Sequence, residues 1–301
     1  MTFVLTGSAM HLWGEKVAHE WPIPWAKVQG HAFPNKEWEF SVPDCPASSI
    51  FIQNFDRNIH DRLAETLLVL PQLERPVGCF PYGCYMRQGT AFAHCLQAFA
   101  AMGIESLVLV DPHIFDDFKG WNLFPIHVLD TSIVFAQSLK SRPQKAPIIL
   151  SPDQGSAKRA YTLAHALRLK HAIDSSVLVC EKSRSQGSVH IRLPRVEPGA
   201  LCWIRDDMID SGRTLFCLAR QLKEARAQRI EAFVTHASLR DREAFLHELS
   251  DSALDQLTVT DSLDHGLREH PKVREVSIVP AVIELLKTIT GAEQKSQQKH
   301  H

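Results

Sequence analysis

The stretch that decides the fold is Leu201-Cys-Trp-Ile-Arg-Asp-Asp-Met-Ile-Asp-Ser-Gly-Arg-Thr214. An apolar run ends in two adjacent acids, and a third acid then opens a short Ser-Gly-Arg-Thr turn before a helix-like segment. An apolar run of this kind is typical of a buried parallel strand. The pattern therefore predicts the strand, loop and following helix of an α/β unit.

The turn carries groups that suit a phosphorylated sugar. Ser211, Gly212 and Thr214 offer hydroxyls and closely approachable backbone N–H groups. They lie at a predicted helix N-terminus, which is where phosphates bind. A bare phosphate would be repelled by the three acids, so the ligand must also offer hydroxyls to Asp206, Asp207 and Asp210. No Gly-Lys-Ser/Thr follows the strand, which excludes a Walker loop. An ordinary polar loop is the alternative interpretation.

Composition and charge limit the classes of function. The chain has 301 residues, 45% hydrophobic and 22% charged, which predicts a soluble globular protein of two domains. A net charge of -1 gives no electrostatic footprint for nucleic acid or an anionic membrane. No apolar run is long enough to span a bilayer, and the N-terminus lacks the pattern of a secretory signal.

Seven cysteines, with no Cys-x-x-Cys pair, suggest neither a zinc site nor a disulfide framework. We expect six of them to be small core residues in a reducing cytosol, and hence a cytoplasmic protein. These six are Cys79, Cys84, Cys95, Cys180, Cys202 and Cys217.

Short β-branched runs recur along the chain, each followed by a polar loop and a helical pattern. This alternation predicts parallel sheets covered by helices on both faces. The runs are 49–53, 77–80 and 107–110 in the first half and 147–150, 177–180, 201–204, 230–234 and 257–260 in the second. A polar, proline-containing linker at 140–147 divides the chain, so we expect one domain over 1–142 and another over 143–278. The remaining residues, 279–301, are expected to form a helix that packs back on the first domain, followed by a frayed tail.

Ligands of such folds bind beyond the carboxyl ends of the strands. After the run 147–150, Ser151-Pro-Asp-Gln-Gly-Ser156 can form an anion-holding nest of N–H groups, with Asp153 placed to hold a cation. A capped helix with a Pro-Asp turn is the alternative. Beyond the run 177–180, Lys182 and Arg184 alternate on an extended backbone and can serve phosphoryl transfer, although a solvated hairpin is the plainer interpretation.

These motifs together resemble the ribose-phosphate diphosphokinases, the phosphoribosyl pyrophosphate synthases of the phosphoribosyltransferase superfamily. The acidic loop is most similar to theirs, Lys182-Ser-Arg184 matches their Lys-x-Arg catalytic loop, and the other elements follow in the family's order from about residue 3 to 290. Those other elements are Phe33-Pro-Asn-Lys-Glu37, Phe80-Pro-Tyr-Gly-Cys-Tyr-Met-Arg-Gln88, Val110-Asp-Pro-His113 and Thr235-His236. The resemblance implies two successive phosphoribosyltransferase-type, doubly wound, mainly parallel sheets with helices on both faces.

The resemblance also implies an activity: transfer of the diphosphoryl group of ATP to the C1 hydroxyl of ribose 5-phosphate, with Mg²⁺ as cofactor. Lys182 and Arg184 would be catalytic, and His113 and Asp153 would contact the metal. Ribose 5-phosphate would be bound by Asp206, Asp207, Asp210, Ser211, Gly212, Arg213 and Thr214. ATP would be bound by Phe33, Asn35, Glu37, Arg87, Gln88 and His113, and its diphosphate by Asp153, Gln154, Gly155 and Ser156. Because the family's Phe33–Glu37 element reaches a neighbouring subunit, a homo-oligomer, a dimer or higher, is expected.

Three features depart from the family. The connection after Gln88 is short, Asn35 and Lys36 replace an acid and a glycine, and Arg213 replaces the usual second glycine of the acidic loop. From the short connection we expect neither classical phosphate activation and ADP inhibition nor a classical hexamer. A non-catalytic relative that binds ribose phosphates or nucleotides, and a phosphoribosyltransferase, are the alternative functions.

Overall fold

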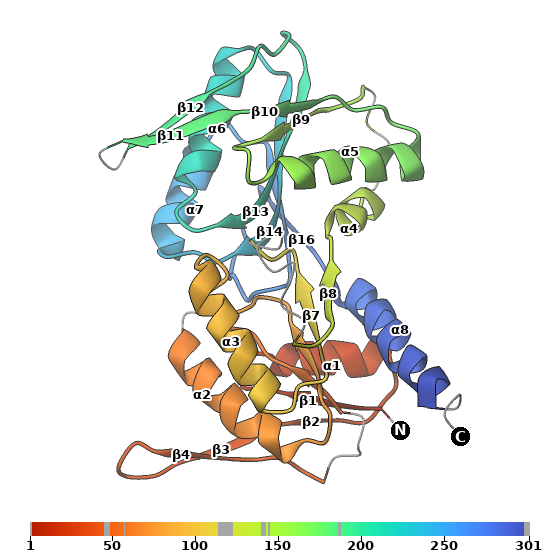
Figure 1. Cartoon of the computed structure of the whole chain (residues 1–301). Coiled ribbons are helices and arrows are strands. Elements are labelled where there is room, and N and C mark those ends of the chain that lie inside the picture. Colours follow the sequence, from red (N-terminus) through yellow and green to blue (C-terminus); the bar gives the residue numbers. More distant parts are fainter. Residues whose placement is uncertain are drawn as a thin grey trace. The chain divides into compact units, whose positions relative to one another are not determined.

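The computed structural model describes residues 2–44, 49–56, 58–113, 123–139, 143, 145–185 and 188–297. The chain divides into two compact units, one of Met1–Leu129 with Val279–His301 and the other of Asp130–Ile278. Each unit is an α/β fold with a six-stranded sheet flanked by helices (Figure 1). The predicted fold class is thereby confirmed.

In the first unit the strand order is β2-β1-β5-β6-β7-β8, and every pair in this sheet is parallel. The strands are β1 (Phe3–Thr6), β2 (Trp25–Lys27), β5 (Ser49–Ile52), β6 (Val77–Phe80), β7 (Ser106–Val110) and β8 (Ile126–Leu129). The helices are α1 (His11–Glu20), α2 (Ile59–Val69), the short 3₁₀ turn η1 (Leu70–Gln72), α3 (Gly89–Ala101) and α8 (Val279–Gln297). A separate antiparallel hairpin pairs β3 (Gln29–Ala32) with β4 (Trp38–Ser41).

In the second unit the order is β10-β9-β13-β14-β15-β16, again parallel throughout. The strands are β9 (Ile148–Ser151), β10 (Val177–Val179), β13 (Leu201–Ile209), β14 (Arg229–Ala237), β15 (Gln256–Thr260) and β16 (Val273–Val276). The helices are α4 (Ser132–Gln137), α5 (Ala157–His171), α6 (Arg213–Glu224) and α7 (Arg242–Asp251). The antiparallel hairpin of this unit joins β11 (Glu181–Ser185) to β12 (Ser188–Arg192).

The division between the units falls after Leu129, earlier than the expected boundary at residue 142. Helix α4 accounts for the difference. Its fully buried Phe135 packs edge-on against Phe233 of β14 in the core of the second unit, with 5.6 Å between the ring centroids. Parts of the expected linker at 140–147 lie outside the described residues. Helix α8 belongs to the first unit and lies against α1.

Cysteine usage follows the expectation from the sequence. Five of the six cysteines named above are buried, Cys217 is half-buried, and all six are free thiols. Cys180 and Cys202 belong to one apolar cluster and Cys84 and Cys95 to another, as small hydrophobic side chains do. None of the described helices is both long and apolar enough to cross a bilayer.

Candidate active site

The two acids at the centre of the site belong to a strand, not to a loop. Strand β13 runs on to Ile209, whereas the apolar run predicted an end near Ile204. The extension is held by β14, whose residues pair with Asp206 and, further on, with Ile209. The carboxyl groups of these two successive acids lie close to each other, because a side-chain hydrogen bond and the charge of Asp207 both act on Asp206.

Asp206 is a partly buried carboxyl near the end of β13, next to the loop after β9. The Ser156 hydroxyl, fifty residues away in sequence, donates to Asp206 Oδ1 at 2.7 Å. The Asp207 backbone N–H donates to the same oxygen at 2.9 Å. Burial, followed by the charge of Asp207, raises the pKa of Asp206 from 3.8 to about 7, although the Ser156 hydrogen bond opposes the shift. A carboxyl with this pKa changes charge near neutral pH, which is common at functional sites.

Asp153 ties the loop after β9 to the hairpin β11–β12. Its Oδ1 accepts from the Ser156 N–H at 3.1 Å, and its Oδ2 lies 3.1 Å from Lys182 Nζ. The Ser151 hydroxyl donates to the Asp153 carbonyl at 2.6 Å. The structure therefore brings together the predicted catalytic lysine and the predicted diphosphate loop.

Arg159 is a site residue that the sequence reasoning missed. Its Nη1 donates to the Gly155 carbonyl at 3.3 Å, and its Nη2 lies 3.6 Å from Asp207 Oδ2. Both side chains are largely buried, at 13% and 3% exposure. A cation in the first turn of a helix opposes the helix dipole, so Arg159 at the start of α5 was a signal that a carboxylate lies nearby.

The turn after β13 requires glycine at position 212. Gly212 precedes α6 with φ of 76°, and a Cβ there would lie 2.3 Å from a ring carbon of Phe216. The flanking Ser211 and Arg213 are exposed and Thr214 is half-buried. Exposed donors next to a tight turn at a helix N-terminus remain accessible to an anion. The turn thus has the geometry expected for a phosphate loop.

Asp210 has a partner that the sequence did not predict. Arg240, in the loop after β14, lies with Nη2 3.0 Å from Asp210 Oδ2, and its backbone N–H donates to the Asp210 carbonyl at 3.3 Å. The Arg240 side chain is 80% exposed, so this pair is solvated and weak. A ligand hydroxyl can therefore displace Arg240 from the carboxylate at little cost.

His236 lies beside the acidic strand, at the register position of Met208. Its Nδ1 is 2.8 Å from the Ser262 hydroxyl, which itself donates to the Thr235 carbonyl at 3.1 Å. This buried arrangement fixes the end of β14 next to β13.

Arg184, the second predicted catalytic residue, lies in β11 opposite Val189 of β12, two positions after Lys182. Its side chain falls outside the described part of the structure. The backbone of this segment is extended, as the alternation of Lys182 and Arg184 requires.

The predicted nucleotide residues lie in the first unit. Arg87 and Gln88 are exposed between β6 and α3, where the Gln88 N–H donates to the carbonyl of Tyr85 at 2.7 Å. Tyr85 has a positive φ of 50°, so the segment makes a tight turn directly before the helix. His113 is exposed after β7, and the residues that follow it, from 114 to 122, are not described.

Phe33, Asn35 and Glu37 form the tip of the hairpin β3–β4. The Phe33 N–H donates to the Glu37 carbonyl at 2.8 Å, and the Glu37 N–H donates to Asn35 Oδ1 at 3.2 Å. Asn35 therefore stabilises the turn, and Lys36 takes the positive φ of 69° for which the family uses glycine. The phenyl ring of Phe33 is 41% exposed.

Among the described side chains, no group of three or more His, Cys, Asp or Glu could hold a metal ion. The three acids nearest the site each contact another side chain: Asp206 contacts Ser156, Asp153 contacts Lys182, and Asp207 contacts Arg159. A hard cation at this site would take most of its ligands from water and from ligand phosphates, which suits magnesium.

Known proteins resemble this chain over nearly its whole length. The model of the phosphoribosyl synthetase-associated domain matches residues 195–298. A ribose-phosphate pyrophosphokinase of Ralstonia nicotianae is 26% identical, covering 96% of this chain and 95% of that protein. One of Helicobacter pylori is 27% identical over 95% of this chain and 92% of its own length, and one of Vibrio cholerae is 28% identical over 82% of each.

The fold agrees with these sequence matches. The crystal structure of phosphoribosylpyrophosphate synthetase from Mycobacterium smegmatis superposes with a TM-score of 0.82 at 20% identity, covering 97% of this chain and 99% of that one. The resemblance inferred from the sequence is confirmed: the chain is similar in sequence to ribose-phosphate pyrophosphokinases and shares the fold of a phosphoribosylpyrophosphate synthetase.

Proposed function

We propose that the protein is a ribose-phosphate diphosphokinase, which converts ATP and ribose 5-phosphate to AMP and phosphoribosyl pyrophosphate. The observation that carries the proposal is the junction in the second unit. There the Ser156–Asp206 hydrogen bond joins the diphosphate loop to the sugar-phosphate loop, and the Asp153–Lys182 pair adds the catalytic hairpin. Relatives named for this activity align with nearly the whole chain.

In the proposed complex, the turn at Ser211–Thr214 binds the 5-phosphate through its N–H groups and hydroxyls. Asp206 and Asp210 accept hydrogen bonds from the ribose hydroxyls, which orients the C1 hydroxyl. That oxygen attacks the β-phosphorus of ATP, the bond from this phosphorus to the oxygen bridging it to the α-phosphorus breaks, and AMP leaves. The hydroxyl proton passes to water, so no protein nucleophile is needed.

Lys182 stabilises the charge that develops on the transferring group, and we assign the same role to Arg184. Asp153 and His113 are the proposed protein ligands of Mg²⁺, which when bound neutralises the phosphate oxygens. Lys182 Nζ lies 3.1 Å from Asp153 Oδ2, so Asp153 holds the proposed catalytic lysine next to the proposed diphosphate loop.

The nucleotide half of the proposal rests on the first unit. We assign ATP contacts to Arg87, Gln88 and His113 and to the hairpin tip at Phe33–Glu37, where the exposed phenyl ring of Phe33 suits stacking on a base. Because this hairpin serves a neighbouring subunit in the family resembled, we infer a dimer or a larger homo-oligomer, which sedimentation velocity tests directly. The free thiols support the proposed cytoplasmic location.

The test is AMP formation by the purified protein in the presence of Mg²⁺, ATP and ribose 5-phosphate. We expect AMP that depends on the sugar phosphate, and a loss of about 10²–10³-fold in turnover for Lys182→Ala. Lys170→Ala, an exposed lysine at the end of α5, is the matched control and should keep full activity. Full activity of Lys182→Ala would refute the catalytic assignment.

The same assay separates the other functions. Saturable nucleotide binding without AMP would indicate a non-catalytic relative, in line with the substitutions at Asn35 and Lys36. Release of pyrophosphate from phosphoribosyl pyrophosphate only when a base is added would indicate a phosphoribosyltransferase.

A further inference from the structure

The two units repeat one build, element by element. Apart from α4, which opens the second unit and has no counterpart in the first, each unit has a strand, a helix and an edge strand, then an antiparallel hairpin, then four more parallel strands (Figure 1). The orders β2-β1-β5-β6-β7-β8 and β10-β9-β13-β14-β15-β16 are the same under this correspondence. In each sheet the direction of winding reverses between the first and third strands in chain order, which are β1 and β5 in one unit and β9 and β13 in the other. α/β folds bind ligands at this switch point.

The strand register shows what the first unit carries at the position of the acidic pair. Leu5, one residue before the end of β1, pairs with Phe51, and Leu150, one residue before the end of β9, pairs with Ile204. Two and three positions after Phe51 come Gln53 and Asn54. Two and three positions after Ile204 come Asp206 and Asp207. The first unit therefore has two neutral amides in place of the two acids.

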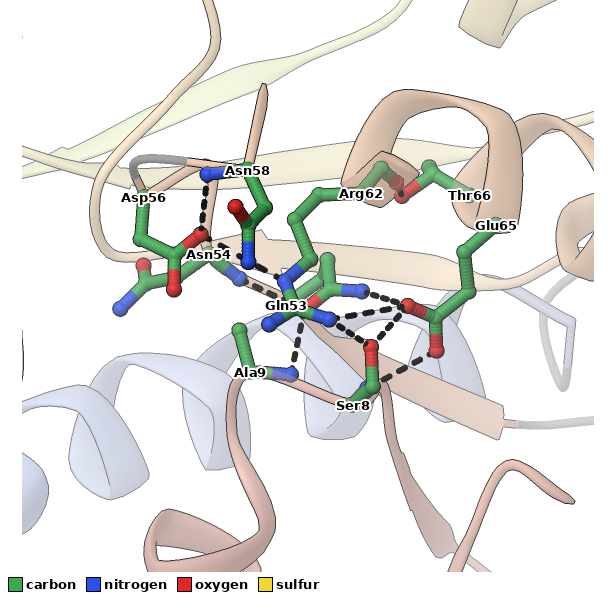
Figure 2. A network of polar contacts seen from close by, with 9 residues as sticks. All are labelled: Ser8, Ala9, Gln53, Asn54, Asp56, Asn58, Arg62, Glu65 and Thr66. Atoms are coloured by element: carbon green, nitrogen blue, oxygen red, sulfur yellow. Dashed lines mark hydrogen bonds and ion pairs between the residues drawn. The ribbon is translucent and has the colours of Figure 1, made fainter. Parts of the chain in front are cut away.

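A carboxylate from the following helix contacts the first of these amides, Gln53 (Figure 2). Glu65 of α2 is only 1% exposed. Its Oε1 accepts from the Ser8 N–H at 2.8 Å, and its Oε2 accepts from Gln53 Nε2 at 2.9 Å and from the Ser8 hydroxyl. Arg62 Nη1 lies 3.9 Å from Oε2 and also donates to the Ser8 hydroxyl.

The donors around Glu65 are those that would otherwise hold an external anion. Ser8 follows the end of β1 by two positions, as Asp153 follows the end of β9, so its N–H belongs to the equivalent of the diphosphate loop. In the second unit the equivalent helix position, six residues after the first residue of α6, is the buried Ala219. No carboxylate from α6 can therefore take this place there.

Gln53 closes the site from the other side. A Cβ at Gly7 would lie 2.2 Å from Gln53 Nε2, so the amide packs directly on the backbone after β1. Gln53 Oε1 also accepts from the N–H groups of Ala9 at 3.3 Å and of Asn54 at 3.0 Å. The amide is itself fully buried, so the switch point of the first unit is occupied by the chain's own side chains.

We propose that Glu65 is a resident anion: its carboxylate occupies the first unit's copy of the anion site, and its removal leaves a latent site for a small oxyanion. The inference does not depend on the reaction proposed above. A resident carboxylate explains why only the second of two equivalent units would bind the sugar phosphate. In the first unit the donors already contact the Glu65 carboxylate.

The test is anion rescue of Glu65→Ala. Truncation leaves the donors of Ser8, Gln53 and Arg62 without their acceptor, which should lower Tm by roughly 4–8 °C. Formate, acetate or inorganic phosphate should then raise Tm of the variant in a saturable way, beyond any rise in the wild-type protein and beyond an ionic-strength match with chloride. If the variant folds only with anion, refolding yield against formate concentration is the readout.

Two variants serve as controls. Glu65→Gln keeps the volume filled, so we expect destabilisation without rescue. Glu248→Ala removes an exposed carboxylate of α7, and its stability should not respond to formate. The proposal would be overturned if all three variants were rescued equally. It would also be overturned if none of the three anions improved either Tm or refolding yield of Glu65→Ala. AMP formation by the wild-type protein is assayed separately, so the two ideas can fail independently.

Discussion

Replacing Asp206 by asparagine should stabilise the unliganded protein at alkaline pH while removing sugar-phosphate binding. Burial and the charge of Asp207 raise the pKa of Asp206 to about 7 in the folded chain. An acid whose pKa is raised on folding stabilises the folded state at low pH. This contribution to the free energy of unfolding is lost as pH rises from the pKa of the acid in the unfolded chain to its pKa in the folded chain. The asparagine side chain cannot ionise, and its carbonyl can still accept from the Ser156 hydroxyl and the Asp207 N–H.

The size of the effect follows from the shift. A rise in pKa from 3.8 to about 7 is about three units, or roughly 4 kcal/mol at about 1.4 kcal/mol per unit. Part of this is already lost by pH 5, because the unfolded carboxyl titrates near pH 4. The wild-type second unit should therefore lose roughly 2–3 kcal/mol more than Asp206→Asn between pH 5 and pH 8.

Urea denaturation of both proteins at pH 5 and pH 8 measures this difference, with the transition of the second unit followed by fluorescence of Trp203 in β13. Ribose 5-phosphate binding, measured by calorimetry at pH 8, should be lost in the variant because Asp206 holds a ribose hydroxyl in the proposed complex. An identical pH dependence of stability in the two proteins would refute the reasoning about the burial of Asp206.

Three further predictions concern the same unit. Gly212→Ala forces a Cβ against the ring of Phe216 at positive φ, and should lower stability by about 1–3 kcal/mol in urea denaturation. Arg159→Met should raise KM for ribose 5-phosphate and shift the pH profile of kcat/KM, whereas Arg159→Lys should recover part of the loss; unchanged profiles would show that the contact with Asp207 is dispensable. Burial would raise the pKa of Glu275, but hydrogen bonds from His265 and Arg268 outweigh it and lower the pKa from 4.5 to about 2. The contribution of Glu275 to stability is therefore present above pH 4.5 and fades towards pH 2. Glu275→Gln should thus be less stable than wild type at pH 6 and converge with it in acid, and a pH-independent difference would contradict this.

Much of the fold could be predicted because the central strands are continuous apolar runs. The runs at 77–80, 107–110 and 257–260 coincide with β6, β7 and β15. Three of the four edge strands of these sheets escaped recognition: β2, β8 and β16 are only partly buried and lack the uninterrupted apolar pattern of a strand covered on both faces. The fourth, β10, was predicted because its three residues form an apolar run. Strand β1 was also missed.

The site was predictable where chemistry follows a strand end. Ser156 and Asp206 meet because β9 and β13 are neighbours and their carboxyl ends share one edge of the sheet. The contact between Arg159 and Asp207 was not predicted, since it depends on the rotation of α5 above the sheet, which spacing alone does not fix. The closing of the first unit by Glu65 likewise depends on the helix α2 docking on a particular face.

The most direct test of the central claim is the ³¹P NMR spectrum of a reaction of the wild-type protein with Mg²⁺, ATP and ribose 5-phosphate. Diphosphoryl transfer predicts AMP and phosphoribosyl pyrophosphate in equal amounts, with the β- and γ-phosphorus of ATP recovered together on the sugar. ADP with inorganic phosphate, or AMP with free pyrophosphate and no pyrophosphorylated sugar, would contradict it.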